Sequence, residues 1–142
     1  METTMTAGYP CKKRTEGLSH LVKQLAISST PAALKRGSFI VNDVPGDMNI
    51  AADENMLASV VGGMLNTVVN HAENSCIRID ARTHGNIVLV EVKDSSSINS
   101  YAVASGIQKF QPMAEKMGGY LCITSQHEKM MTIAFSFPIS AQ

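Results

Sequence analysis

The sequence predicts an α+β fold, a two-layer α/β sandwich with helices on one face of a mostly antiparallel mixed sheet. Two observations predict this fold. An apolar stripe at helical spacing runs along residues 53–72, and alternating, strand-like segments follow in pairs at 76–94 and 120–137. Helices and strand pairs in this order pack as two layers, because each layer covers the apolar side of the other.

Bulk composition argues against several classes of function. The 142 residues suit one domain, and 12 Lys and Arg residues balance 12 Asp and Glu residues, so the composition gives no support for nucleic-acid binding. The 3 cysteines are far apart and have no metal-like spacing, which indicates a reducing compartment, and we expect a cytoplasmic protein. No apolar run approaches the ~18 residues of a membrane span, so we expect no membrane partner.

The folded domain is predicted to span residues 17–142. Residues 1–16 show no periodicity and contain Gly, Pro and a basic triplet, so we expect them to form a flexible leader. A short helix follows over 17–25, where apolar residues recur at helical spacing. The Ser-Ser-Thr-Pro run at 28–31 is expected to end it.

The main helix is predicted between Asp53 and Ala72. Asp53 is a favourable N-cap, and its carboxylate suits the positive end of the helix dipole. Gly62 and Gly63 each weaken a helix interior by up to ~1 kcal/mol relative to alanine, which indicates that a ligand or a neighbouring element approaches the backbone there. The apolar stripe consists of Leu57, Val60, Val61, Met64, Leu65 and Val68.

Three pairs of strands are predicted from period-two alternation and the turns between them. The pairs are 38–43 with 47–51, 76–82 with 87–94, and 120–125 with 130–137. Asp94 shares a strand face with three valines, so its side chain is expected to point into the layer under the helices. A carboxylate in that layer needs hydrogen bonds from the protein or from a ligand.

A last helix is predicted from residue 102 or 105 to Met117. Pro112 would kink this helix or delay its start, because proline cannot donate to the hydrogen-bond ladder. Gly118 and Gly119 then end it.

Motifs of one known family occur in order along the chain. Residues 52–71 resemble the family's N box, Val92-Lys93-Asp94 its first glycine box, and residues 106–125 its second glycine box with the following strand. Phe135-Ser136-Phe137-Pro138 resembles its last strand. The ordered set resembles the ATP-binding domain of sensor histidine kinases, a branch of the superfamily of gyrase, the large heat-shock chaperone and MutL. The resemblance covers roughly residues 17–139.

This resemblance implies a signalling module that binds an adenine nucleotide, ATP or ADP, and a protein partner such as a response regulator or a kinase. Asp94 stands where the family's aspartate takes the adenine amino group. The resemblance assigns no residue as catalytic or as a metal ligand. The other residues carried over to the nucleotide site are Gly63, Thr67, Asn70, His71 and Gly106.

The departures from the family pattern predict that the metal and lid elements are degenerate. The family's magnesium-holding asparagine falls on Thr67, the asparagine one turn earlier on Gly63, and the basic phosphate contact on Asn70. Three serines at 95–97 replace the expected Gly-x-Gly, and little chain is left for a lid before Gly106. Phosphoryl transfer depends on a metal ion and preorganised donors, so we do not expect magnesium binding or kinase activity.

Four residues have two interpretations each. Asp94 is either a ligand-binding carboxylate or a turn former ahead of the serines. His71 either stacks on a base or caps the helix end, and Gly63 admits either a phosphate or a closely packed neighbour. His20 is either a phospho-accepting histidine or an ordinary residue of an amphipathic helix, and the missing acidic neighbour favours the second.

Two function hypotheses from different classes follow. The first is a pseudokinase-like module of two-component signalling that retains weak nucleotide binding through Asp94. The second is a nucleotide-free interaction or phosphotransferase-like scaffold, by analogy with sporulation-type phosphotransferases. A third, a serine kinase of the anti-sigma-factor type, fits the length but requires the missing asparagine. An open polar cleft around Asp94 would favour the first, and a cleft filled by Met56, Tyr101 or Phe110 the second.

Overall fold

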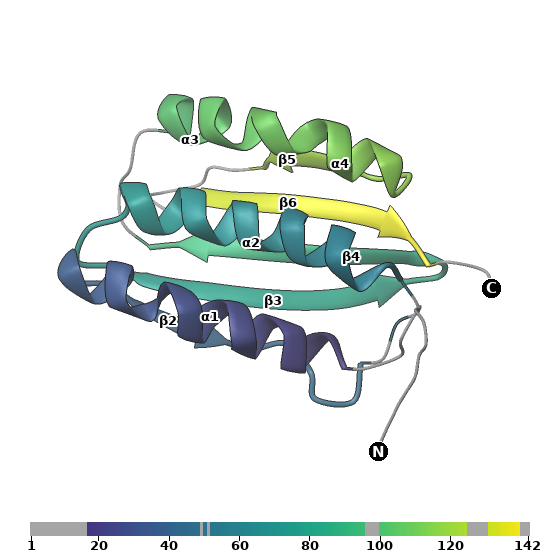
Figure 1. Ribbon diagram of the computed structural model, residues 1–142, viewed down its shortest axis with the longest axis horizontal. Coiled ribbons are helices and arrows are strands. Elements are labelled where there is room, and N and C mark those ends of the chain that lie inside the picture. The colour runs from purple at the N-terminus through teal and green to yellow at the C-terminus, as the bar shows by residue number, and fades with distance from the viewer. Residues whose placement is uncertain (1–16, 49, 51, 96–99, 125–130, 140–142) are drawn as a thin grey trace, which may run out of the picture.

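The computed structural model describes residues 17–48, 50, 52–95, 100–124 and 131–139 (Figure 1). The leader expected at 1–16 lies outside the described residues. In chain order the elements are α1 (Leu18–Lys35), β2 (Phe39–Asn42), α2 (Glu54–His71), β3 (Cys76–His84), β4 (Ile87–Asp94), α3 (Ser100–Ile107), the 3₁₀ turn η2 (Gln108–Phe110), α4 (Gln111–Lys116), β5 (Tyr120–Ile123) and β6 (Met131–Pro138).

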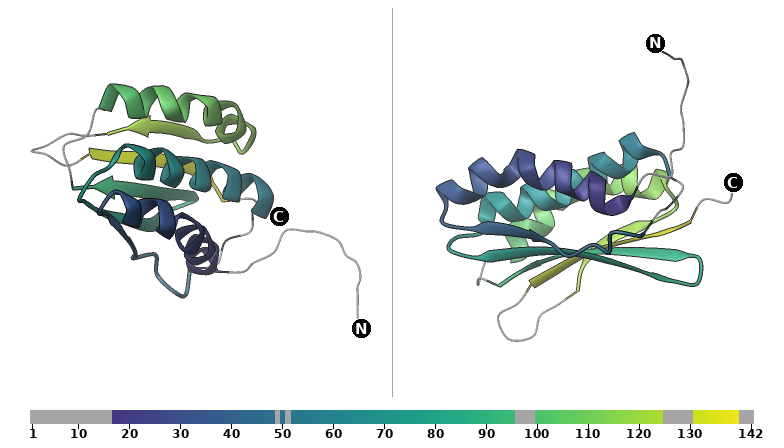
Figure 2. Two further views of the ribbon diagram at one scale, coloured as in Figure 1. Left: turned by 60° about the vertical axis from the view of Figure 1, so that its left-hand side comes forward. Right: turned by 90° about the horizontal axis from the view of Figure 1, so that it is seen from below.

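The elements form two layers. The sheet has the order β2-β3-β4-β6-β5, in which β2 and β3 are parallel and the other neighbouring pairs are antiparallel. The described helices all lie on one face of this sheet (Figure 2). The predicted two-layer sandwich, with its mostly antiparallel mixed sheet, is therefore confirmed. Within the described ranges, no helix is long and apolar enough to cross a membrane.

The main helix is confirmed as α2, which lies between α1 and α3 over the sheet (Figure 1). The side chain of Asp53 caps it by accepting the N–H groups of Asn55 and Met56, at 3.0 and 3.2 Å. Every residue of the predicted apolar stripe is buried. The stripe therefore forms the centre of the core between the helices and the sheet.

The predicted hairpin of 38–43 with 47–51 is wrong. β2 pairs in parallel with β3, and the carbonyl of Met48 accepts the N–H of Leu18 at the start of α1 (3.0 Å). Parallel neighbours need a crossover connection, which here contains α2 and begins with the segment after β2. Alternation identifies β2 as a strand but carries no information about its partner.

The predicted end of the first helix is also wrong, because α1 continues through Pro31 to Lys35. A proline inside a helix costs roughly 3 kcal/mol. Here the ring is exposed, the Thr30 hydroxyl donates to the carbonyl of Ala26 at 2.7 Å, and Ala33 beyond the proline is fully buried. Packing of the last turns into the core therefore outweighs the unfavourable proline.

The last helical segment is interrupted as Pro112 predicts. Residues 100–116 form α3, the single turn η2 and then α4, and Pro112 lies in the first turn of α4. Gly118 ends the segment with a φ of 79°, in the left-handed region that glycine adopts without strain. The interruption matters for the site, because it places Phe110 of η2 against α2.

Candidate functional site

Asp94 points into the layer under the helices, as the alternation of β4 predicts. Its side chain is fully buried, like those of Val88, Val90 and Val92 on the same face. The carboxyl group accepts a hydrogen bond from the hydroxyl of Ser75. The predicted requirement for hydrogen bonds in this layer is therefore met, at least in part, by the protein itself.

Hydrogen bonds connect Asp94 to two buried serines that the sequence does not single out. Ser75 donates to Asp94, and Ser38 contacts Ser75. The N–H of Ser75 donates to the Ser38 hydroxyl at 3.2 Å, and the Ser75 hydroxyl lies 3.4 Å from that of Ser95. Each of the two directly precedes a strand, β2 or β3, and parallel pairing brings these strand starts together. That position is the only signal in the sequence that could have identified them.

The hydroxyl and the methyl group of Thr67 both contact other residues of the protein. The hydroxyl donates to the carbonyl of Gly63, one turn earlier in α2, at 2.8 Å. A Cβ placed on Gly106 of α3 would lie 2.8 Å from the Thr67 methyl carbon, so only glycine allows this approach. Three of the predicted site residues, Gly63, Thr67 and Gly106, therefore lie close together between α2 and α3. Their contacts are packing contacts and hydrogen bonds within the protein.

The ring of Phe110 lies directly on the backbone of α2 at Gly63. A Cβ placed on Gly63 would stand 2.6 Å from three carbons of this ring. Of the two interpretations of Gly63, close packing accounts for this contact. Phe110 is also one of the side chains expected to fill a cleft. Met56 is half-buried near the start of α2, and the side chain of Tyr101 lies outside what the structure describes.

Asn70 and His71 lie at the C-terminal end of α2. Asn70 is exposed. Nδ1 of the half-buried His71 donates to the carbonyl of Thr67 at 2.9 Å, which requires the tautomer with a proton on Nδ1. The last carbonyls of a helix lack intrahelical donors, so this bond stabilises the helix end. Helix capping, one of the two interpretations of His71, accounts for this contact.

The described residues at this site offer few ligands for a magnesium ion. Magnesium requires oxygen ligands in near-ideal octahedral geometry. At the position of the family's magnesium-holding asparagine, Thr67 offers a single hydroxyl, which donates its proton to the carbonyl of Gly63. Among the described residues, no group of three or more His, Cys, Asp or Glu side chains could hold a metal ion.

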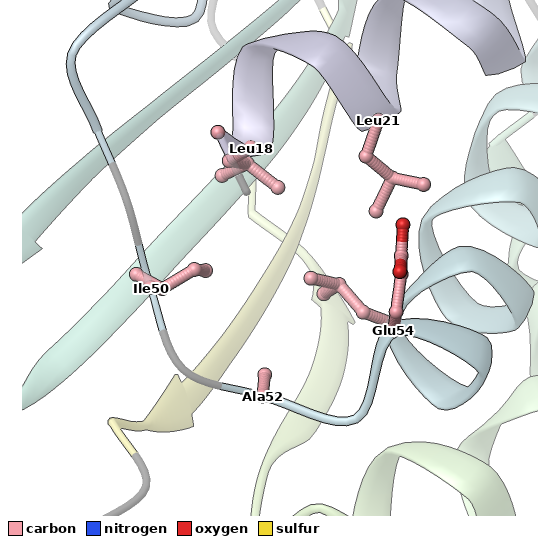
Figure 3. Close-up of a pocket in the computed structure, with 7 residues that line it drawn as sticks. Leu18, Leu21, Ile50, Ala52 and Glu54 are labelled. Atoms are coloured by element: carbon pink, nitrogen blue, oxygen red, sulfur yellow. The ribbon is translucent and has the colours of Figure 1, made fainter. Parts of the chain in front are cut away.

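A small hollow lies near the other end of α2, between its first turn and the start of α1. It is lined by Leu18, Leu21, Ile50, Ala52 and Glu54 (Figure 3), together with Gly17 and Leu57. Its volume of about 20 Å³ compares with the 10–15 Å³ or so that one water needs. It is too small for a nucleotide and contains none of the predicted site residues.

Paired charges lie on the face of the sheet opposite the helices. Arg78 Nη1 lies 2.5 Å from Asp43 Oδ2, and this hydrogen-bonded carboxylate raises the pKa of Arg78. Lys93 lies 3.7 Å from Glu91. Burial raises the pKa of the Cys122 thiol, which makes its reactive thiolate less populated at neutral pH. Because these charges pair, the described residues of this face show no concentration of one sign.

No protein-family model matches the chain, and no curated protein matches it in sequence. Solved structures match its fold. Histidine kinase AdeS of Acinetobacter baumannii has a TM-score of 0.78 at 7% identity, over 94% of this chain and 70% of that chain. A catalytic domain of histidine kinase ThkA has a TM-score of 0.77 at 16% identity, over 93% of this chain and 100% of that chain.

Other solved kinases have known ligands and partners. Full-length ShkA, solved in complex with AMPPNP, has a TM-score of 0.75 at 18% identity, over 96% of this chain and 33% of that chain. ThkA is also solved in complex with the response regulator protein TrrA. At identities this low, similarity establishes the fold alone. The chain therefore has the fold of histidine kinase catalytic domains, as the order of its motifs predicts.

Proposed function

We propose that this chain is a signalling module that uses a histidine-kinase-type fold to bind a protein partner and does not transfer phosphate from ATP. The contact between Phe110 and Gly63 carries this proposal. By the resemblance, Gly63 and Thr67 occupy the positions of two N-box asparagines, the second of which holds magnesium. Both positions here serve the packing of α2 against the segment 106–110.

A nucleotide phosphate at these positions would have to displace the packing groups. The ring of Phe110 is half-buried, and exposing it to water would cost about 1 kcal/mol. Release of the Thr67 hydroxyl from Gly63 adds about 1 kcal/mol. Each 1.4 kcal/mol or so is a factor of ten in affinity, so displacement weakens nucleotide binding by roughly tenfold to a hundredfold.

Weak adenine-nucleotide binding is the second candidate function, and the position of Asp94 favours it. The carboxyl group is buried on the helix side of β4, at the strand end where the family's aspartate takes the adenine amino group. An adenine bound there would have to share this carboxyl group with Ser75. ATP or ADP without magnesium is the ligand expected in that case.

The proposed partner is a signalling protein, either a response regulator or a kinase. The ThkA complex with its response regulator is a precedent on the same fold. We place the protein in the cytoplasm, where its cysteines stay reduced. Residues 17–142 are proposed as the folded module.

Isothermal titration calorimetry of ATP and ADP, each with and without magnesium, tests this function. An ATP-binding histidine kinase catalytic domain serves as the positive control. The wild type is expected to give no heat at millimolar nucleotide. Heat that disappears in Asp94→Asn would establish the second candidate. Magnesium-dependent ATP turnover would contradict the proposal outright.

A further inference from the structure

The outward side of α1 carries three exposed apolar residues in one stripe. Ile27 is 58% exposed and Leu34 is 62% exposed, and the ring of Pro31 between them is also exposed. Steps of four and three residues place all three on one side of the helix. We call this set the α1 outer stripe. The opposite side of α1 contributes its buried residues to the core.

The stability of the domain does not account for this stripe. Single exposed apolar residues are ordinary, but three in one row on a solvent-facing helix form a continuous apolar ridge. Pro31 also weakens the helix, because it cannot donate to the carbonyl of Ile27. At positions this exposed, a polar helix former such as lysine or glutamine would suit α1 about as well.

The charges around the α1 outer stripe are positive. The sequence of α1 contains no Asp or Glu. Lys23 and Lys35 are exposed beside the stripe, and no described residue forms an ion pair with either of them. Arg36, just after the helix, differs because its guanidinium lies 3.4 Å from Glu73.

This charge pattern distinguishes between possible occupants. A symmetric dimer through this face would place the same surface on both sides and bring lysines close to lysines. A membrane-bound helix needs a wide apolar face, whereas this stripe is three residues long and exposed polar residues of α1, such as Gln24 and Ser28, lie next to it. An apolar ridge with acidic flanks is the complementary surface.

We propose that the α1 outer stripe is the docking site for an amphipathic helix of the partner protein, with acidic residues on both sides of its apolar face. Docking of one helix against another through apolar residues at these spacings is a common recognition mode. The inference names the partner surface of the proposed interaction module and rests on that proposed function.

The test uses a fluorescently labelled helical peptide with leucines at i, i+4, i+7 and i+11 and glutamates on both flanks. A second peptide carries lysines in place of the glutamates. Fluorescence anisotropy with the full chain is expected to show at least about tenfold tighter binding of the acidic peptide. Equal binding of both peptides, or no binding of the acidic one, would overturn the proposal.

Surface variants locate the binding. The double variant Ile27→Ser, Leu34→Ser is expected to weaken acidic-peptide binding by at least about tenfold. Tyr120→Ser is the matched control, since Tyr120 on β5 is also 58% exposed, and it should bind as the wild type does. The double variant Lys23→Glu, Lys35→Glu should reverse the preference toward the basic peptide. An unchanged preference in that charge-reversed variant would refute the docking site.

Two other outcomes would also overturn the proposal. A dimer in analytical ultracentrifugation that the Ile27→Ser, Leu34→Ser variant loses would identify a second copy as the occupant. Binding to vesicles of phosphatidylglycerol and phosphatidylcholine that the same variant loses would identify a membrane. Peptide binding tests α1 and nucleotide calorimetry tests Asp94 and Phe110, so failure of this inference and failure of the proposed function are separately visible.

Discussion

Apolar side chains are used in opposite ways at two places on the helical layer. Between α2 and η2, glycine removes the side chain at position 63, and the ring of Phe110 packs on the bare helix backbone. On the outward side of α1, Ile27 and Leu34 project from the helix and remain more than half exposed. The first arrangement buries apolar surface inside the domain, and the second leaves it exposed on the surface.

The difference suggests where this chain binds. In the family that the sequence resembles, the region around positions 63 and 67 serves nucleotide and magnesium. Here the same region holds a glycine, an internally bonded threonine and an aromatic ring. Exposed apolar side chains lie instead on the outward side of α1. Both proposals follow from this contrast between the two regions.

Removal of the Phe110 ring should have the largest effect on stability. Phe110→Ala is expected to lower the free energy of unfolding by about 2 kcal/mol, less than for a fully buried phenylalanine because this ring is half-buried. Urea denaturation followed by circular dichroism measures the change. A loss below about 0.5 kcal/mol, the usual range for surface substitutions, would mean that the ring does not hold η2 against α2.

Adjacent glycines in α2 should respond in opposite directions to alanine. Gly63→Ala is expected to destabilise the domain by about 1 kcal/mol net, because overpacking against Phe110 exceeds the gain in helix propensity. Gly62→Ala is the matched control, since its Cβ would meet only the Leu25 side chain at 3.4 Å. That variant should gain up to about 1 kcal/mol. The free energy of unfolding is measured for both variants. An increase in both would contradict the close contact between Phe110 and Gly63.

The contact between α3 and α2 should show a rescue by a smaller residue. Gly106→Ala is expected to lower the free energy of unfolding by about 1 kcal/mol, because its Cβ would press on the Thr67 methyl group. In a Thr67→Ser background, which lacks that methyl group, the same substitution should become nearly neutral. A double-mutant cycle measures this coupling. Simple additivity of the two changes would disprove the contact.

The α1 outer stripe should matter least for stability. The Ile27→Ser, Leu34→Ser variant is expected to lower the free energy of unfolding by less than about 1 kcal/mol in total, because both side chains are more than half exposed and one surface substitution usually changes it by no more than about 0.5 kcal/mol. The same urea titration provides the value. A loss of 2 kcal/mol or so would assign the stripe to folding and remove the reason to seek a partner there.

Much of the fold follows from sequence periodicity. The stripe from Leu57 to Val68 predicts α2, and the alternation around Val90 predicts both β4 and the inward side of Asp94. Periodicity does not identify the partner of β2, because strand pairing depends on how the whole chain crosses over. It also cannot weigh the unfavourable Pro31 against the burial of Ala33, so the helix end is missed.

Less of the site follows from the sequence. The positions of Asp94, Thr67 and Gly63 can be assigned, but their contacts cannot, because Ser75 and Phe110 come from distant segments. From the sequence alone, a glycine at position 63 is equally compatible with a phosphate and with an aromatic ring close to the backbone. Only the arrangement of η2 distinguishes them.

Amide NMR spectra of the wild type, recorded with Mg-ATP and then with the acidic helical peptide, test both proposals most directly. Millimolar Mg-ATP is expected to leave the amides of Gly63, Thr67 and Asp94 unshifted. The peptide should shift amides along α1 between Lys23 and Lys35. Nucleotide-dependent shifts at Gly63 and Asp94, with α1 unaffected by the peptide, would contradict both proposals.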